Sequence, residues 1–390
     1  MTYDAIIIGG GAAGLFCALT AGARGRRVLV LEHNREVGAK ILISGGGRCN
    51  FTNIHTTPDR FISDNPDFCR SALARYTPGD FTGLVEKHNI AYYEKTLGQL
   101  FCEGAGSAKK IVRMLLDECA AAGVDIRVGC AATSVSLSEL YRVETNLGAF
   151  ESRALVLAAG GLSIQKLGAS DFAHRIARQF GLAIVAPRPG LVPLTFAEAD
   201  RAWMAPLSGV SADVVARAGK AAFREAALFT HRGLSGPAIL QVSTYWRDGE
   251  SIAIDWTPDH DETHLIAAKR TRPKAHIKAI LSERMSARLA EVLAHALPAP
   301  ALGDVKDDVL LEAARRLKTW NLTPAGTEGY AKAEVTVGGV DTRALDQKTM
   351  EARAAPGLFV IGEAVDVTGW LGGYNFQWAW ASGAAAGRAL

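Results

Sequence analysis

The sequence has few of the features that mark secreted, membrane-spanning or nucleic-acid-binding chains. It contains 6 Cys in 390 residues, with no C-x-x-C pair and no zinc-type spacing, which indicates reduced thiols in a cytosolic protein and no metal site. Asp4 and Arg24 interrupt the apolar N-terminus, so we expect neither a signal peptide nor a membrane span. The net charge of +3 is too small to indicate nucleic acid or an anionic membrane. These absences predict a cytoplasmic protein without nucleic-acid or membrane partners.

Glycine is abundant instead, with 40 residues, and the first glycine run lies between two expected strands. Ala5–Ile8 and Val28–Leu31 are short apolar runs that suit strands buried on both faces. The alanine-rich segment between them predicts a helix to about Ala23. The order strand, glycine turn, helix, strand predicts a βαβ unit.

The glycines of this turn have the spacing of a dinucleotide-binding motif. Gly9, Gly11 and Gly14 form G-x-G-x-x-G, in which the first permits a tight turn, the second lets the backbone approach a pyrophosphate, and the third allows close helix–strand packing. Glu32 ends the second strand, where a carboxylate can accept hydrogen bonds from ribose hydroxyls. The pattern therefore predicts a dinucleotide site, with an ordinary βαβ unit as the alternative.

The C-terminal segment carries a second signal. The expected strand Leu358–Ile361 leads through Gly362 and Glu363 into a glycine-rich loop, and a helix is expected from about Asn375. A flavin dinucleotide needs a group that bonds its ribityl hydroxyls and a helix N-terminus directed at the ring edge where negative charge collects on reduction. Glu363 suits the first role and the 372–375 backbone the second. A capping loop before a core helix is the alternative.

Between the two ends the chain predicts further helices and strands. Leu73–His88 and Ser107–Ala122 are expected helices, the second with Ser107 as its N-cap. The other expected elements are a strand over 125–128, a three-stranded antiparallel meander over 133–136, 141–145 and 149–151, a buried strand over 154–158, and a strand over 331–337.

The composition and the hydrophobic pattern of the chain change near Pro187. Residues 212–230 are broken into short strand-like pieces, and residues 260–320 are helical and rich in Lys, Arg and Glu, which indicates a solvated face rather than a binding patch. The simplest organisation is an α/β protein whose Rossmann-like FAD-binding domain contains the βαβ unit and the antiparallel meander. That domain takes residues 1–186 and 326–390. Residues near 187–325 are inserted into this domain.

Four strings resemble the BaiN-like (YhiN-like) NAD(P)/FAD-dependent oxidoreductases, within the superfamily that shares the glutathione-reductase-type FAD domain. They are KILISGGGRCNFTN (Lys40–Asn53), FTHRGLSGPAIL (Phe229–Leu240), AEVTVGGV (Ala333–Val340) and the run Thr349–Gly387. The chain departs from the family pattern over 101–109 and 161–168. The resemblance implies an FAD-dependent oxidoreductase that passes hydride or electrons through flavin N5 to a small organic acceptor such as an activated carbon–carbon double bond.

The resemblance also implies a three-part architecture, in which a β-rich domain (187–257) and a small helical subdomain nested within the insert (258–325) accompany the FAD-binding domain. It further implies which residues hold the cofactor and where the substrate lies. The substrate is expected at the flavin face between the FAD domain and the insert, near Gly338, Gly339, His231 and Tyr374. The residues implied for FAD are Gly9, Gly11, Ala12, Ala13, Gly14, Glu32 and His33 for the ADP half, Lys40, Ser44, Gly45, Gly46, Gly47, Arg48, Cys49 and Asn50 along the pyrophosphate and flavin, Ala132 for adenine, Ala159 and Gly160 for the phosphates, Gly362, Glu363 and Asp366 for the ribityl chain and pyrophosphate, and Gly372, Gly373, Tyr374 and Asn375 for the pyrimidine edge.

Three of the polar residues have two interpretations each. Cys49 is either a redox thiol beside the flavin or a small packed residue. His231 is either a proton donor facing the flavin or an ordinary loop histidine. Arg48 either neutralises a phosphate or holds an anionic substrate. His231 and Arg48 are the two residues that we expect to act in catalysis.

Several alternatives remain for the reaction. No second complete G-x-G-x-x-G exists for NAD(P)H, so either the nicotinamide docks transiently at the substrate mouth or another donor is used. A flavin-dependent RNA-modifying or RNA-binding protein is the second hypothesis, although the weak net charge and the lack of a basic, aromatic-interleaved stripe count against it. An NAD-only dehydrogenase and a flavoprotein without turnover are further alternatives. No pattern indicates the oligomeric state.

Overall fold

The structure is a computed structural model that describes residues 2–390, and the chain forms two compact units. The first unit runs to Arg188 and resumes over Val335–Leu390, whereas the second unit is Pro189–Glu334. The two ends of the chain therefore build one unit around an insertion. The return to the first unit comes later than the expected residue 326, because β18 (Gly326–Thr327) pairs with β12 (Leu194–Thr195) in the second unit.

The first unit is built on a seven-stranded sheet in the order β7-β2-β1-β10-β9-β8, with β20 also paired to β10. β1, β2, β7, β10 and β20 are parallel, and β9 and β8 continue the sheet as an antiparallel meander. The strands are β1 Thr2–Ile8, β2 Val28–Leu31, β7 Asp125–Arg127, β8 Ala132–Leu137, β9 Tyr141–Thr145, β10 Gly148–Leu157 and β20 Leu358–Val360.

β10 unites two strands that were expected to be separate. Residues 149–151 and 154–158 lie in one strand because β1 pairs with β10 from Glu151 to Leu157 and keeps the backbone extended. The first half of β10 pairs with β9 and the second half with β20. Ile8, Leu31 and Leu157 are in register, so the segments that follow β1, β2 and β10 leave the same edge of the sheet.

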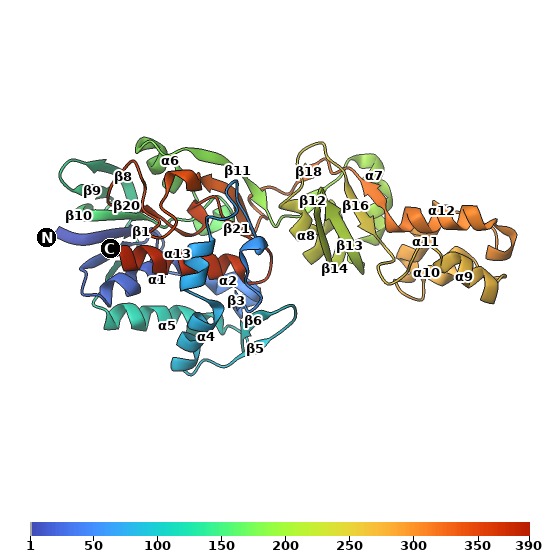
Figure 1. Cartoon of the computed structure of the whole chain (residues 1–390), viewed down its shortest axis with the longest axis horizontal. Coiled ribbons are helices and arrows are strands. Elements are labelled where there is room, and N and C mark those ends of the chain that lie inside the picture. The colour runs from blue at the N-terminus through green and yellow to red at the C-terminus, as the bar shows by residue number, and fades with distance from the viewer. Residues whose placement is uncertain (1) are drawn as a thin grey trace. The chain divides into compact units, whose positions relative to one another are not determined.

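Helices cover both faces of this sheet (Figure 1). α1 (Ala12–Gly22), α5 (Ala108–Ala121) and the C-terminal α13 (Tyr374–Ala389) lie below it, and α6 (Phe172–Gln179) lies above it. α1 and α13 pack so closely that a Cβ on Gly383 would come within 2.7 Å of the carbonyl oxygen of Ala13. The first and last helices of the chain therefore share one core.

The expected helix Leu73–His88 is two helices, α3 (Arg70–Arg75) and α4 (Pro78–Lys87). Pro78 disfavours the helical conformation of the residue before it, and Thr77 is extended and forms a capping box with Asp80. Ser107 does precede α5, but the expected side-chain cap is wrong. Its hydroxyl donates instead to the carbonyl oxygen of Cys102, at 3.2 Å.

A small layer of irregular structure lies beside the sheet. α2 (Ala39–Gly47) is broken at Ser44–Gly46, where the backbone leaves the helical region. The remaining elements of the first unit are β3 Asn50–Asn53, β5 Tyr92–Glu94 and β6 Gln99–Cys102 in one sheet, β4 Phe61–Ile62 with β21 Thr368–Gly369, β11 Ile184–Gly190 with β19 Val335–Val340, and the short 3-10 turns η1 Pro58–Arg60, η2 Gln165–Leu167, η5 Thr342–Ala344 and η6 Gly362–Ala364.

The second unit combines a seven-stranded sheet, in the order β17-β16-β13-β14-β15-β12-β18, with a group of helices. Residues 212–230, which were expected as short strand-like pieces, form a regular hairpin of the two long strands β13 and β14. The strand expected over 331–337 is β19 of the first unit, which begins and ends later, at Val335 and Val340. The other elements are β13 Ser211–Ala218, β14 Ala221–Thr230, β15 Gly233–Ser235, β16 Ile252–Asp255, β17 Trp320–Leu322, α7 Glu198–Met204, η3 Ala205–Leu207, α8 Pro237–Ser243, α9 His264–Thr271, α10 Ile277–Leu281, α11 Ala287–His295, η4 Leu302–Asp304 and α12 Asp307–Lys318.

Across residues 2–390, the helices are too short or too polar to cross a membrane.

Candidate functional site

The turn between β1 and α1 shows different surroundings for its three glycines. A Cβ on Gly9 would overlap the carbonyl oxygen of Ala158, and a Cβ on Gly14 would overlap that of Gly9. Gly9 also has φ +115°, in the region that favours glycine. A Cβ on Gly11 would have no atom within 4 Å. Packing inside the protein therefore requires two of the glycines, whereas Gly11 borders open space in front of α1.

This open space lies at the uncapped N-terminus of α1. Gly11 is the N-cap residue of α1 and provides no side-chain bond to the first N–H groups. Such N–H groups, with the positive end of the helix dipole, attract phosphate. Open space at Gly11, facing free helix N–H groups, fits the pyrophosphate of a dinucleotide.

Glu32 is buried beside this turn, and the protein uses its carboxylate in part. Oε2 accepts from the Gly10 N–H and Oε1 from the Asn34 N–H, both at 2.8 Å. His33 Nδ1 lies 3.1 Å from Oε1. A carboxylate has about four acceptor positions, so Oε2 keeps capacity for a ribose hydroxyl. Glu32 thus holds the glycine turn in addition to the role expected for it.

The segments expected around the adenine and phosphates reach the same edge of the sheet. The N–H of Cys130 donates to the carbonyl of Glu32 at 2.9 Å, which places the start of β8 at Ala132 near the end of β2. The N–H of Ala158 donates to the carbonyl of Ile8 at 2.9 Å, so Ala159 and Gly160 follow beside the glycine turn. The structure brings these predicted residues together.

Lys40 and Glu363 form an ion pair at the centre of the site. Lys40 Nζ donates to Glu363 Oε2 and to Ser163 Oγ, each at 2.7 Å. Glu363 Oε1 accepts from Ser163 Oγ at 2.7 Å and from the Thr336 N–H at 2.9 Å. Four segments that are remote in the sequence therefore meet at one carboxylate. Sequence analysis predicted Lys40 and Glu363 but not Ser163 or Thr336.

The ion pair determines the charge of Glu363. Burial raises the pKa of this carboxyl, but the Lys40 charge and the hydrogen bonds from Lys40, Ser163 and Thr336 outweigh burial and hold the pKa below its ordinary value. The carboxylate is therefore ionised at neutral pH, and Oε2 keeps one free acceptor position toward a hydroxyl group.

Asp366 is buried three residues further along the chain. Its Oδ2 accepts from the Asp64 N–H at 2.9 Å and from the Ser63 hydroxyl at 3.4 Å. Burial raises the pKa of this carboxyl, and the charges of Asp64 and Asp341 raise it further. Ser63 and Asp64 were missed by sequence analysis, because they lie in an irregular segment without a motif.

The glycine-rich loop before α13 rests on β3. The Asn53 amide donates to the carbonyl of Gly372 at 2.8 Å, and a Cβ on Gly373 would overlap the carbonyl of Thr52. Asn375 closes the loop, since its amide accepts from the Gly369 N–H and donates to the Gly369 carbonyl, both at 2.9 Å. The N-terminus of α13 at Tyr374 is thus fixed by residues of β3 that follow the predicted run Ser44–Asn50.

The run Ser44–Asn50 itself lies at the break in α2. A Cβ on Gly45 would come within 2.6 Å of Phe101, whereas a Cβ on Gly46 would have no atom within 4 Å. Arg48 donates to the Tyr93 hydroxyl at 3.2 Å and remains half-buried. Gly46 therefore leaves the backbone open to a ligand, whereas Gly45 is required by packing.

Cys49 lies in this run but is completely buried. Burial raises the pKa of its thiol far above the ordinary value, and a protonated thiol is a poor nucleophile. All six cysteines are buried free thiols, and burial raises the pKa of Cys69 and Cys102 to about 11 and that of Cys119 to about 12. These surroundings favour the packed-residue interpretation of Cys49.

We therefore expect the native protein to show no rapidly reacting thiol. Treatment with a chromogenic disulfide reagent at mildly alkaline pH should release little product until denaturant is added, when all six thiols react. A single fast thiol in the native protein that disappears in Cys49→Ala would instead support a redox role for Cys49.

His174 on α6 is a further buried polar residue near the site that sequence analysis missed. It is 2% exposed and bonds to the backbone of Ala364, next to Glu363. Burial lowers the pKa of the imidazole, so it is neutral at neutral pH. Its Nε2 has no partner within residues 2–390. No pattern in the sequence indicated a buried polar group here, because His174 occupies an ordinary position of the amphipathic helix α6.

The two residues expected to act in catalysis lie in different units. Arg48 belongs to the site described above. His231 belongs to the second unit, where it is exposed in the turn between β14 and β15. A catalytic role for either residue stays a prediction. The part of the chain that the structure describes contains no group of three or more His, Cys, Asp or Glu that could hold a metal ion.

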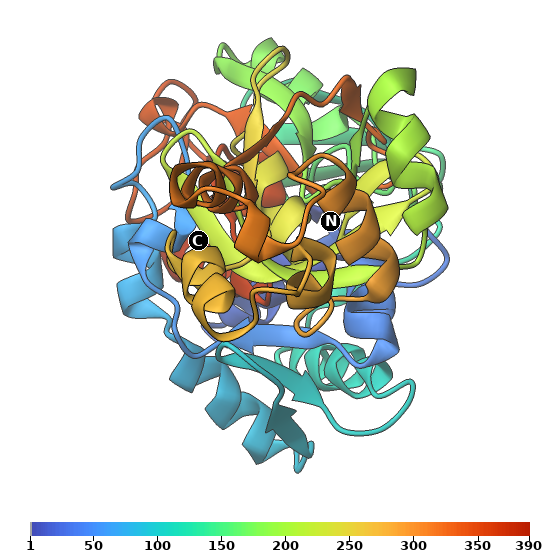
Figure 2. The same ribbon diagram turned by 90° about the vertical axis from the view of Figure 1, so that its right-hand side faces the viewer.

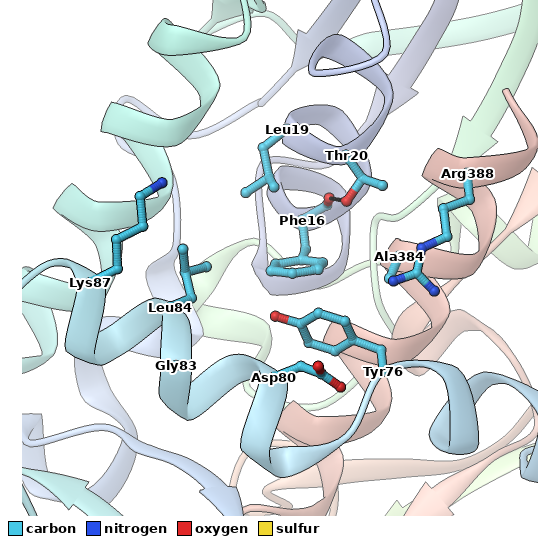
Figure 3. Close-up of a pocket in the computed structure, with 10 residues that line it drawn as sticks. All are labelled: Phe16, Leu19, Thr20, Tyr76, Asp80, Gly83, Leu84, Lys87, Ala384 and Arg388. Carbon is cyan, nitrogen blue, oxygen red and sulfur yellow. Dashed lines mark hydrogen bonds between the residues drawn. The ribbon is translucent and has the colours of Figure 1, made fainter.

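A separate cavity of about 420 Å³ lies between α1, α4 and α13 (Figure 3). Phe16, Tyr76 and Leu84 form its apolar part, and Asp80, Lys87 and Arg388 border it. None of the residues predicted to hold the cofactor lines it. The phenol of Tyr76 points into this cavity (Figure 3), which shares no lining residue with the candidate site at the carboxyl edge of the sheet.

The chain matches a known protein family over nearly its whole length. The model of the HI0933-like protein Rossmann domain matches residues 3–389. The chain is 49% identical over 387 residues to the ribosomal RNA dihydrouridine synthase of Escherichia coli strain K12, covering 97% of this chain and 96% of that protein. It is 28% identical over 407 residues to the 3-dehydro-bile acid delta(4,6)-reductase of Clostridium scindens, covering 98% of each.

A solved structure with a similar fold is the 3-ketosteroid-delta4-(5alpha)-dehydrogenase of Rhodococcus jostii RHA1 in complex with 4-androstene-3,17-dione. The TM-score is 0.50 at 14% identity, over 99% of this chain and 97% of that chain. The similarity therefore covers the fold of the whole chain.

Proposed function

The chain belongs to the HI0933-like Rossmann domain family of FAD-dependent oxidoreductases, and from this membership we propose that it reduces the C5–C6 double bond of a uridine in ribosomal RNA, with FAD as cofactor. The observation that carries the proposal is the 49% identity, over nearly the whole of both chains, to a ribosomal RNA dihydrouridine synthase. Of the hypotheses that the sequence left open, this one unites reduction of an activated double bond with RNA modification.

The chemistry named for the more distant relative is of the same kind. In a uracil ring the C5–C6 bond is conjugated to the C4 carbonyl, and in a 3-dehydro bile acid a delta-4 bond is conjugated to the 3-keto group. Reduction of either adds a hydride to one carbon and a proton to the other. Both relatives therefore act on double bonds that a neighbouring carbonyl activates.

The residues of the first unit fit FAD in the arrangement described above. Gly11 and the N–H groups of Ala12 and Ala13 would hold the pyrophosphate, Glu32 a ribose, and Glu363 the ribityl hydroxyls. When bound, FAD supplies the hydride chemistry that no side chain can provide. The protein's own part is to hold Glu363 ionised through Lys40 and to fix the start of α13 against β3.

The electrons must come from a donor, for which NAD(P)H is the proposed class. His231 stays the proposed proton donor, and Arg48 the proposed contact to an anionic group. The proposed RNA substrate differs from the expectation of a small-molecule partner without nucleic acid. That expectation rested on the net charge of +3, which does not describe how charge is distributed over the surface.

The proposal is tested with ribosomal RNA from a strain in which the gene for this protein has been deleted. Purified FAD-loaded protein is incubated anaerobically with this RNA and NADH, NADPH or dithionite, and the digested nucleosides are quantified by mass spectrometry. We expect dihydrouridine to appear with at least one reductant and only when FAD is present. Absence of dihydrouridine with all three, together with reduction of a 3-keto-4-ene steroid, would favour a small-molecule enone reductase instead.

A further inference from the structure

The second unit contains a segment whose charge is unlike that of its surroundings. Residues 269–278, hereafter the basic turn, read KRTRPKAHIK and contain five Lys or Arg and no acidic residue. They span the end of α9, the connection and the start of α10. The whole unit from 189 to 334 holds 18 Lys or Arg and 18 Asp or Glu. The basic turn is therefore a local concentration of positive charge in a neutral unit.

Intramolecular ion pairs use some of these charges but not all. Lys269 donates to the Val305 carbonyl at 2.6 Å and to Asp307 at 2.8 Å. Arg272 pairs with Glu283, and Lys278 pairs with Glu291 at 3.2 Å.

Two cations of the basic turn remain without such partners. Arg270 and Lys274 are exposed and make no ion pair within residues 2–390. Lys306, which lies between the two acceptors of Lys269 in the sequence, is also exposed and unpaired in the same part of the chain. Arg270, Lys274 and Lys306 are thus three exposed cations of the second unit that make no ion pair within residues 2–390.

The backbone of the basic turn is fixed rather than loose. The Gly303 N–H donates to the Pro273 carbonyl at 2.7 Å, and the Leu302 N–H donates to the Ala275 carbonyl at 2.8 Å. Leu265 and Ile277 anchor α9 and α10 in the core of the unit. The turn is part of the helical group α9–α12, drawn in gold and orange in Figure 2. A charged surface on a rigid backbone loses little entropy when it binds a partner.

We propose that the basic turn, with Lys306, binds the phosphate backbone of structured ribosomal RNA; this inference rests on the proposed function. Exposed Lys and Arg without partners are the groups that displace counterions from phosphates. Contacts of this kind position an RNA without reading its bases. The surface therefore holds the RNA while another part of the protein selects and reduces the uridine. The interpretation of residues 260–320 as a purely solvated face is replaced for this segment.

The test compares two double variants that remove the same charge from the same unit. Arg270→Gln/Lys274→Gln alters the basic turn. The control, Arg217→Gln/Lys220→Gln, alters two exposed cations of the β13–β14 hairpin that also have no ion pair within residues 2–390. Both variants should keep the FAD content and melting temperature of the wild type, because the replaced side chains make no ion pair in the fold.

We measure KM for ribosomal RNA from the deletion strain over a series of salt concentrations. The basic-turn variant should raise KM about tenfold and lower the slope of log KM against log salt by ~2, one unit for each lost phosphate contact. The control should match the wild type. If the wild type is fully active and both variants have its KM, the basic turn is not an RNA-binding surface, and the proposed function is unaffected. A wild type that makes no dihydrouridine would overturn both.

Discussion

Gly11→Val should purify without FAD and yet melt close to the temperature of the wild-type apoprotein. Gly11 has extended backbone dihedrals, φ −84° and ψ −169°, that any residue adopts. A Cβ there meets no atom within 4 Å, and replacing the glycine N-cap of α1 by Val costs about 1 kcal/mol, which is much less than a clash in the core would cost. It would, however, occupy the space that the pyrophosphate needs in front of α1. We expect FAD affinity to fall by about 100-fold or more, which is ~3 kcal/mol.

The measurement is a titration of apoprotein with FAD, followed by flavin fluorescence, together with thermal melting of each apoprotein. Gly83→Val on α4 is the matched control, because a Cβ on Gly83 also meets no atom within 4 Å. That variant should bind FAD like the wild type. Gly14→Val, whose Cβ would overlap the Gly9 carbonyl, should lose stability as well as FAD. Normal FAD binding by Gly11→Val would show that the cofactor lies elsewhere.

The second large effect is expected at the buried ion pair. Lys40→Met leaves the Glu363 carboxylate with its bonds from Ser163 and Thr336 but without a cation. Breaking a fully buried pair costs ~3–5 kcal/mol. The two side chains are 32% and 21% exposed, and solvent reduces the loss, so we expect the free energy of unfolding of the apoprotein to fall by about 2 kcal/mol at neutral pH.

The pH dependence should change sign in this variant. In the wild type the pKa of Glu363 is lower when folded than when unfolded. Its contribution is present above the unfolded pKa of about 4.3 and disappears as the pH falls through the folded value. In Lys40→Met, burial dominates and raises the pKa of Glu363 in the folded protein. Ionisation of this carboxyl then lowers the free energy of unfolding as the pH rises from about 5 to 7. Urea unfolding of the apoprotein at several pH values measures both slopes.

Two further variants separate the charge effect from simple packing. Lys40→Met/Glu363→Gln removes the unpaired charge and should recover most of the lost stability, with little pH dependence. Lys109→Met, an exposed residue on α5, should leave stability nearly unchanged. If Lys40→Met is equally destabilised at every pH, or if the double variant recovers nothing, then Glu363 is not held ionised by Lys40.

The parts of the site that could be predicted from the sequence are those encoded by local spacing. Gly9, Gly11, Gly14 and Glu32 lie within one βαβ unit, and the physical task of each glycine follows from its place in the turn. The structure shows two of these glycines closely packed and the third next to open space. A local pattern is sufficient here because the turn, the helix and the next strand are adjacent in the chain.

The pairing of remote residues could not be predicted in this way. Lys40 and Glu363 are 323 positions apart, and neither Ser163 nor Thr336 belongs to a motif that indicates a hydrogen-bond partner. His174 occupies an ordinary amphipathic helix position. Such contacts arise from how the helices and loops pack on the sheet, and only the fold reveals them.

Errors in the predicted elements have local causes as well. The break between α3 and α4 follows from Pro78, which disfavours a helical conformation of Thr77, and the expected helix Leu73–His88 did not take this local effect into account. Residues 149–151 and 154–158 form one strand and not the expected two, because the continuity of β10 depends on its pairing with β1, which is remote in the sequence. The basic turn shows the same limitation for charge, since a near-neutral total conceals a local concentration.

The packing of α1 against α13 has a consequence for biosynthesis. α1 is synthesised early, but the helix that packs against it is α13, which has 16 residues and begins only at Tyr374. The entire second unit is synthesised between the two helices. The core of the first unit therefore stays incomplete until α13 has been synthesised. A chain that lacks α13 would therefore leave the apolar surface of α1 uncovered in the first unit.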